Sequence, residues 1–218
     1  MVLTLYKFDA SPPARSIFMV LSTLDVPEIN FVDVNLILSE HLAEDFVKIN
    51  PQHTIPTLVD DEFVLWDSHA IALYLIEKYG DISNHPLYPS DLKTRATINQ
   101  RCHFDTGVLF VALRRAVRPL LFYGATSFTQ KMFDDIRFGY SLMEKFLTSP
   151  WLAGDQFTLA DVCCVTSISS LNAILPIDPD AYPRLTSWLE RCSELEIYKK
   201  GNEAGLKLFA SAINSKLA

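Results

Sequence analysis

The feature that most constrains the fold is a change in hydrophobic pattern about eighty residues into the chain. Before this point, short strand-like runs alternate with runs of helical spacing. In order, the runs are VLTLY, SPPARSIFMVLSTL, INFVDVNL, HLAEDFVKIN, IPTLVDDEFVLW and DSHAIALYLIEKYG. We interpret Asp60-Asp61, inside the fifth run, as the turn of an antiparallel hairpin. The pattern predicts the order β-α-β-α-β-β-α.

A polar segment ends this unit, and beyond it strand signals almost vanish. Gly80 is typical of a residue just past a helix C-terminus, and residues 81–90 contain two prolines. Further along, apolar residues recur at helical spacing. The helical segments are expected at Ile98–Leu120, Phe133–Phe146, Leu159–Ile174, Leu185–Leu195 and Leu206–Ile213. Pro119 should kink or end the first of them. The chain is therefore predicted to be α+β, with a domain at residues 1–80, a linker at 81–90 and an all-helical domain at 91–218.

The charge balance argues against nucleic acid as a partner. The chain has 19 Lys and Arg against 26 Asp and Glu, a net charge of −7, whereas binding to phosphates requires the opposite sign. The most apolar later stretch, Leu159–Ile177, contains Asp161 and several hydroxyl side chains, so we expect a buried core helix and no membrane span. Lys7 and Asp9 interrupt the apolar start, which disfavours a signal peptide.

The cysteines and histidines indicate a cytoplasmic protein without a metal. The cysteines are Cys102, Cys163, Cys164 and Cys192. They form no CxxC pair and no zinc spacing, which is typical of reduced thiols. A thioredoxin-type oxidoreductase is excluded because no cysteine lies in residues 1–101. His41, His53 and His69 match no local zinc motif, so we expect hydrogen-bonded histidines, with His41 and His53 near an anionic ligand.

Ser11 is the first candidate for chemistry. Serine before two prolines is a standard helix start, with the hydroxyl accepting a backbone N–H bond. The same position favours an anion because of the helix dipole and the free N–H groups. If a ligand thiolate lies there, Ser11 can donate a hydrogen bond to it and lower its pKa. The residue alone leaves both roles open, and capping is the commoner.

Two further segments suit an extended, charged ligand. In NPQHTIPTL, a cis bond before Pro56 would turn the N–H and C=O of Ile55 outward for pairing with a peptide-like ligand, although trans bonds are commoner. In WDSHA, Asp67 or Ser68 can cap the following helix. The functional alternative is that Ser68 holds a ligand carboxylate while Asp67 pairs with an ammonium.

The first long helix contains a candidate pocket wall. Arg114, Arg115 and Arg118 fit a solvated charged face, yet Arg114 follows the apolar run GVLFVAL and can overlook a pocket. The pocket floor would be Phe110, Leu113, Val117 and Phe122. Such a pocket suits an apolar co-substrate. Downstream, Thr158 and Asp161 in FTLADV form a capping box, which we interpret as structural.

Six motifs, in a fixed order and at fixed separations, together carry a family resemblance. They are SPPARS, NPQHTIPTL, DSHAIALYLIEKYG, LYP, GVLF and FTLADV. The chain resembles the cytosolic glutathione transferases, specifically the insect delta/epsilon type and its epsilon-like members, over nearly its whole length. The resemblance implies a thioredoxin-like N-terminal domain that binds glutathione as co-substrate, an all-helical C-terminal domain that supplies the second-substrate pocket, and a homodimer.

The resemblance also implies roles for single residues. Ser11 would donate a hydrogen bond to the glutathione sulfur, Ile55 would pair with the cysteinyl backbone, and Arg114 would border both substrate sites. The other expected glutathione contacts are His41, His53, Thr54, Pro56, Asp67, Ser68 and His69. The expected pocket for an apolar electrophile consists of Pro13, Leu36, Phe110, Leu113, Val117 and Phe122. Asp67 is one methylene shorter than the Glu that related chains often carry.

The implied reaction is attack of the glutathione thiolate on apolar electrophiles, in detoxification or on an endogenous hydrophobic substrate. Isomerase, dehydrochlorinase or peroxidase activity can accompany it on the same thiolate. Tyr6 is the alternative donor, because other classes of the family use a tyrosine near the end of the first strand. A non-catalytic carrier of hydrophobic ligands on the same fold is the alternative function.

Overall fold

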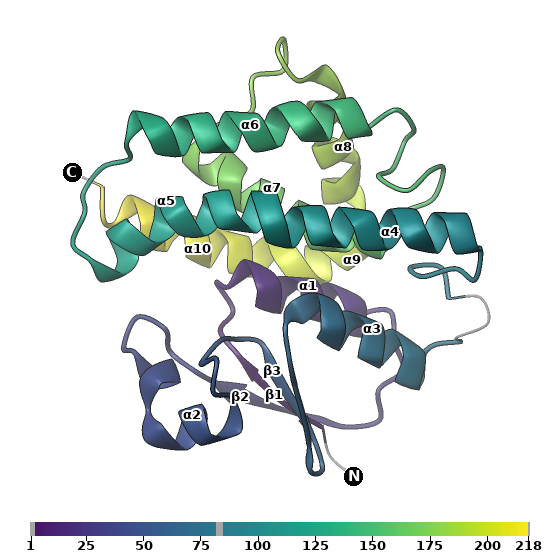
Figure 1. Cartoon of the computed structure of the whole chain (residues 1–218), viewed down its shortest axis with the longest axis vertical. Helices are drawn as coiled ribbons and strands as arrows, with labels where there is room; N and C mark the ends of the chain where they lie inside the picture. Colours follow the sequence, from purple (N-terminus) through teal and green to yellow (C-terminus); the bar gives the residue numbers. More distant parts are fainter. Residues whose placement is uncertain (1–2, 82–84, 218) are drawn as a thin grey trace.

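A computed structural model describes residues 3–81 and 85–217, and its first part is built around a four-stranded sheet (Figure 1). The elements are β1 (Leu3–Lys7), α1 (Pro12–Leu21), β2 (Ile29–Asp33), η1 (Glu40–Leu42), α2 (Glu44–Ile49), β3 (Thr57–Asp60), β4 (Phe63–Trp66) and α3 (Ser68–Tyr79). The sheet order is β2-β1-β3-β4, with β2 parallel to β1 and β3 antiparallel to both β1 and β4. The predicted β-α-β-α-β-β-α order is confirmed.

The hairpin turn lies one residue beyond the predicted pair. Asp60 belongs to β3 and is paired with Phe63, so the turn consists of Asp61 and Glu62, and the prediction of Asp60-Asp61 is wrong by one position. Asp61 has a φ of 54°, in the left-handed region that aspartate tolerates in turns. Asp60 is buried and accepts hydrogen bonds from Tyr74 and Lys78 of α3. The strand therefore retains Asp60 because α3 supplies its partners.

The second part is helical, as predicted (Figure 1). It consists of α4 (Leu92–Phe104), η2 (Asp105–Leu109), α5 (Phe110–Phe122), α6 (Gln130–Phe146), α7 (Leu159–Ile174), α8 (Pro183–Glu194), α9 (Glu196–Tyr198), η3 (Lys199–Glu203) and α10 (Ala204–Asn214). α4, η2 and α5 follow one another without a break, and η2 is a π-helical turn that the sequence pattern did not indicate. Pro119 does not end α5, which continues to Phe122.

α7 is the central helix of this part, and every one of its first thirteen residues is buried. Asp161 at its start accepts hydrogen bonds from the backbone N–H and hydroxyl of Thr158 at 2.9 and 3.1 Å, as the capping-box motif predicts. It also accepts bonds from Leu152 N at 3.0 Å and Trp188 Nε1 at 2.9 Å. Within residues 3–81 and 85–217, no helix is long and apolar enough to cross a membrane.

α1 lies between the sheet and the helical part (Figure 1) and packs closely against the latter. Gly201 of η3 approaches so closely that an added Cβ would lie 2.3 Å from the backbone nitrogen of Met19. Arg15 of α1 is fully buried and donates to Asn202 of η3 at 2.5 Å and to Ser170 of α7. Burial lowers the pKa of Arg15 to about 9. These contacts across the two parts hold α1 in place.

Candidate functional site

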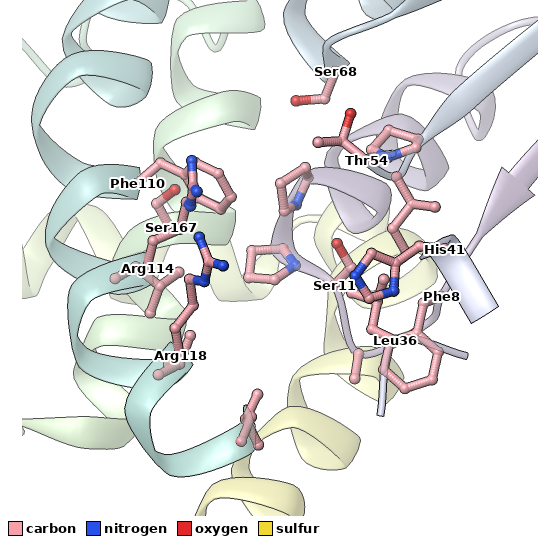
Figure 2. Close-up of a pocket in the computed structure, with 18 of the residues that line it drawn as sticks. Phe8, Ser11, Leu36, His41, Thr54, Ser68, Phe110, Arg114, Arg118 and Ser167 are labelled. Atoms are coloured by element: carbon pink, nitrogen blue, oxygen red, sulfur yellow. The ribbon is translucent and has the colours of Figure 1, made fainter. Parts of the chain in front are cut away.

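A cavity of about 860 Å³ opens between the sheet and the helical part (Figure 2). Its walls come from the β1–α1 loop, the η1 region, the segment before β3, the start of α3, and helices α5, α7 and α10. All the site residues expected from the sequence line it: Ser11, Pro13, Leu36, His41, His53, Thr54, Ile55, Pro56, Asp67, Ser68, His69, Phe110, Leu113, Arg114, Val117 and Phe122. The fold thus gathers segments spread over more than a hundred residues into one site.

Ser11 lies at the cavity wall directly before α1, and only 8% of its surface is exposed (Figure 2). Its side chain makes no capping hydrogen bond, and its backbone N–H donates to the carbonyl of Phe8 at 2.9 Å. Pro12 and Pro13 occupy the first helical positions and have no N–H groups to offer. The commoner role of a helix cap is therefore wrong for this hydroxyl, which leaves it able to donate into the cavity.

Tyr6, the alternative donor, is not among the residues that line this cavity. It lies on β1, and its ring packs edge-on against Phe46 with the ring centroids 5.5 Å apart. Val34, Phe46 and Ile55 form the small buried cluster that it covers. The geometry therefore favours Ser11 over Tyr6 as the donor to a ligand in the cavity.

The segment before β3 contains a cis peptide bond between Ile55 and Pro56, not the commoner trans form. The fully buried Asn50 organises this turn, because its side-chain amide donates to the carbonyl of Thr54 at 3.0 Å and to the hydroxyl of Thr57 at 2.9 Å. Ile55 itself is buried and lines the cavity. Both residues at the bend therefore have a defined position beside the site.

The residue before α3 caps its helix, whereas Ser11 does not cap α1. Asp67 caps this helix by accepting from the backbone N–H groups of His69 at 2.9 Å and Ala70 at 3.3 Å. The His69 side chain is the main cause that lowers the pKa of the Asp67 carboxyl, against an opposing effect of burial. Ser68 is buried and follows directly, so a charged carboxylate and a hydroxyl lie side by side at the cavity wall.

His69 points to the helical part and contacts two residues of η2. Its Nε2 lies 3.1 Å from Asp105 Oδ2, and its Nδ1 lies 2.9 Å from the hydroxyl of Thr106. Burial opposes the charged imidazole, but the bonds to Asp105 and Asp67 outweigh it and raise the pKa of His69 to about 10. His69 is therefore a cation at neutral pH, and it links α3 to the helical part.

His41 and His53 lie together on the other side of the cavity, with ring centroids 6.1 Å apart. Burial, followed by the charges of His53 and Arg118, lowers the pKa of His41, so its imidazole is neutral at pH 7. His69 is engaged elsewhere, so the three histidines do not converge. Among the residues that the structure describes, no group of three His, Cys, Asp or Glu side chains is arranged to hold a metal ion.

The cavity includes residues that the sequence analysis did not assign to it. Asp105 and Thr106 come from η2, Arg118 from α5, and Phe209 from α10. Arg118 had a usable signal, because it lies four residues after Arg114 and so on the same helix face. Asp105, Thr106 and Phe209 had none, because a π-turn and a contact from the end of the chain leave no local pattern.

The raised pKa of His69 predicts a pH dependence of stability. Its pKa in the folded chain, about 10, is above the value of about 6.5 for an unfolded histidine, so its stabilising effect is complete below about pH 6.5 and is lost as pH rises toward 10. The free energy of unfolding should therefore fall between pH 7 and pH 9.5 more steeply in the parent chain than in His69→Gln, by up to about 1.4 kcal/mol per pH unit.

Urea unfolding at a series of pH values measures this slope. His103, an exposed residue at the end of α4, supplies the matched control, and His103→Gln should keep the parent slope. Equal slopes for the parent and His69→Gln would contradict a partly buried, charged His69.

Comparisons with known proteins agree with one another. The family profile described as "Glutathione S-transferase, N-terminal domain" matches residues 5–83, and "Glutathione S-transferase, C-terminal domain" matches residues 134–196. Among curated proteins, the chain is 53% identical to "Glutathione S-transferase 1" of Manduca sexta over 219 aligned residues, covering 100% of both chains. It is 39% identical to "Glutathione S-transferase D7" of Drosophila melanogaster over 88% of this chain and 85% of that one.

Solved structures give the same result. An epsilon-class glutathione S-transferase from the housefly, Musca domestica, matches with a TM-score of 0.92 and 42% identity, covering 98% of each chain. A glutathione transferase homologue from Drosophila mojavensis, solved with bound glutathione, matches with a TM-score of 0.92 and 39% identity over 99% of this chain and 97% of that one.

Proposed function

The chain belongs to the glutathione S-transferase family, and from this premise we propose that the Ser11 hydroxyl stabilises the thiolate of glutathione while an apolar electrophile occupies the helical side of the cavity. The enzyme is a glutathione S-transferase of the insect delta/epsilon type, with a thioredoxin-like N-terminal part. The observation that carries the proposal is a buried hydroxyl at the cavity wall that is not used to cap its own helix.

The polar residues of the N-terminal part suit the groups of glutathione in turn. Asp67 would pair with the ammonium of the γ-glutamyl end, and the buried Ser68 would bind its carboxylate. The backbone of Ile55 would pair with the cysteinyl residue, as one strand pairs with another. His41 and His53 would contact the glycine carboxylate from the opposite end. The homologue with bound glutathione supports a ligand of this kind.

Four further residues would lie next to these glutathione contacts. Thr54 and Pro56 flank Ile55 in the cis turn and would position its backbone for the cysteinyl residue. His69 carries a positive charge next to Asp67 and would keep that carboxylate ionised for the ligand ammonium. Arg114 reaches the cavity from α5 and would border glutathione and the second substrate.

Available interactions are large enough to ionise the thiol at neutral pH. A free thiol has a pKa of about 8.5, and lowering it by two units requires about 2.7 kcal/mol. A hydroxyl donor to a charged acceptor contributes about 1.5 to 3 kcal/mol, and a helix N-terminus contributes up to about 1 kcal/mol. The hydroxyl is the larger of the two, because Pro12 and Pro13 cannot donate.

The helical side of the cavity suits the second substrate. Its apolar wall is lined by Pro13, Leu36, Phe110, Leu113, Val117 and Phe122. An apolar electrophile bound there would face the sulfur across the cavity. The thiolate would form a C–S bond as the leaving group departs. Detoxification, or turnover of an endogenous hydrophobic compound, is the proposed role, with isomerase, dehydrochlorinase or peroxidase activity on the same thiolate.

A non-catalytic carrier of hydrophobic ligands is the alternative on this fold. The test is retention of the chain on immobilised glutathione, followed by an assay with the chromogenic electrophile 1-chloro-2,4-dinitrobenzene. We expect both retention and turnover above the uncatalysed rate. Retention without turnover would favour the carrier, since a carrier has no use for the Ser11 donor.

We also propose how the whole chain is organised. Residues 1–80 would form the glutathione-binding domain, 81–90 the linker and 91–218 the helical domain, although residues 82–84 of the linker lie outside the described part of the structure. The enzyme would act as a homodimer in the cytoplasm, without a metal. Nucleic acid is not an expected partner, given the net charge of −7. A membrane is not expected either, because the most apolar later stretch, Leu159–Ile177, contains Asp161 and several hydroxyl side chains.

A further inference from the structure

α5 carries three arginines within five residues, and two of them line the cavity. Arg114 and Arg118 are separated by four positions and therefore share a helix face, while Arg115 points elsewhere. Figure 2 shows the side chains of Arg114 and Arg118 extending from α5 toward the cavity, opposite Ser11. Like charges at this spacing destabilise a helix slightly, so the pair has a structural cost in an otherwise acidic chain.

The three arginines differ in their partners. Arg115 forms an ion pair with Asp135 at 3.4 Å. Within residues 3–81 and 85–217, no carboxylate lies within ion-pair distance of Arg114 or Arg118. The Arg118 guanidinium donates to the hydroxyl of Tyr123 at 3.1 Å and lies 6.0 Å from the centre of its ring. The partners of Arg118 are neutral, so its positive charge is not compensated.

The two arginines lie at one end of the apolar wall that α5 gives to the cavity. Val117 and Phe122 of the same helix line the cavity beside them. Arg114, Arg118 and Tyr123 also line an adjoining hollow of about 440 Å³, so they separate the main cavity from it. A molecule whose apolar body packs on α5 would therefore present its far end to two guanidinium groups.

The proposed contacts of glutathione place Arg114 at their border and leave the charge of Arg118 unused. Its two carboxylates would lie with Ser68 and with His41 and His53, all on the sheet side of the cavity. Arginine remains protonated at every physiological pH and binds a carboxylate with two parallel hydrogen bonds. His41 is neutral, and the charge of His69 is paired with Asp105 and Asp67. The arginines therefore supply the uncompensated positive charge on the α5 side of the cavity.

We propose that Arg118, together with Arg114, forms an anion subsite of the second-substrate pocket, and that the enzyme favours electrophiles with an apolar body and a carboxylate at the far end. The inference rests on the proposed function of the same cavity. It names a substrate class that the apolar lining alone would not select.

Two aryl chlorides that differ only in charge test the selectivity: 4-chloro-3-nitrobenzoate and 4-chloro-3-nitrobenzamide. In each reaction the thiolate sulfur forms a bond to the ring carbon, chloride leaves with the C–Cl electron pair, and the thiol proton has passed to solvent. The ratio of kcat/KM for the benzoate to that for the benzamide is measured with the full chain at saturating glutathione. Arg118→Gln should lower this ratio about tenfold, as expected for one charge-assisted interaction.

Arg115→Gln is the matched control, because it removes a charge from the same helix outside the main cavity. It should leave the ratio within about twofold of the parent, a change too small for a lost charge-assisted bond. An equal loss for both substrates in Arg118→Gln would overturn the proposal. A higher KM for glutathione with an unchanged ratio would also overturn it, because Arg118 would then hold a glutathione carboxylate.

A binding measurement separates this proposal from the proposed catalysis. The anionic fluorophore 8-anilinonaphthalene-1-sulfonate is titrated into each variant without glutathione. Weaker binding by severalfold in Arg118→Gln, with parent affinity in Arg115→Gln, supports the anion subsite even if the parent turns over neither chloride. Equal affinity in all three chains would overturn it, whatever the outcome for turnover.

Discussion

Ser11→Ala should lower kcat/KM for an aryl halide about 10- to 100-fold and raise the pKa of the bound glutathione thiol by one to two units, since a hydrogen bond to a charged acceptor contributes about 1.5 to 3 kcal/mol and one pKa unit is 1.36 kcal/mol. The Ser11 hydroxyl makes no capping bond, so its removal should not destabilise the start of α1. The Michaelis constant for glutathione should change little, because other residues would hold the rest of the ligand.

The thiolate absorbs in the ultraviolet, so its pKa is measured by titrating the enzyme-glutathione complex, and the pH profile of kcat/KM reports the same group. Its acid limb should move to higher pH in Ser11→Ala. Tyr6→Phe is the matched control, and it should keep the parent pKa because Tyr6 packs on Phe46 outside the cavity. An unshifted thiol pKa in Ser11→Ala, or a shift in Tyr6→Phe, would transfer the role to another donor.

Asp161→Ala should lower the free energy of unfolding by about 3 to 5 kcal/mol, which for a chain of this size means a fall in Tm of about 10 °C. The carboxylate is fully buried. Its loss leaves four buried donors without this acceptor, namely Leu152 N, the backbone N–H and hydroxyl of Thr158, and Trp188 Nε1. Each unsatisfied group costs about 1 to 3 kcal/mol. The start of α7, a helix that packs against α1 further along, would lose its anchor.

Thermal and urea unfolding measure this loss. Asp155, an exposed aspartate in the loop before α7, supplies the control, and Asp155→Ala should change stability by less than about 0.5 kcal/mol. Similar stabilities of the two variants would mean that water or other groups satisfy the four donors. The Asp161 network would then be dispensable.

Local sequence patterns did not fully predict the structure at two places, the hairpin turn and Pro119. The turn was predicted within one position because the apolar residues define both strands. It was misplaced by one residue because an aspartate is equally suited to a turn and to the end of a strand. The strand keeps Asp60 because Tyr74 and Lys78 reach it from α3. Pro119 remains within α5, and three further helical residues follow it. At the hairpin, tertiary partners overrode local preference.

For the site, the sequence predicted the residues on the sheet side and the apolar floor of α5. It did not predict the contact of His69 with Asp105 and Thr106, which are 36 and 37 positions away. The π-turn that brings those two residues to α3 leaves no periodic signal. The charge of Arg118 was visible in the sequence, but its position at the cavity depended on the direction of α5.

The sequence by itself determined the order of the elements, the break between sheet and helices, and the family, because these depend on hydrophobic period, turn chemistry and motif spacing along the chain. Only the tertiary structure decided what the hydroxyl of Ser11 does. A serine before two prolines can cap its helix or serve a ligand, and both roles are compatible with the same residues. The choice depends on where the hydroxyl points, and that direction is set by Arg15, Gly201 and the packing of α1 against helices formed by the far end of the chain.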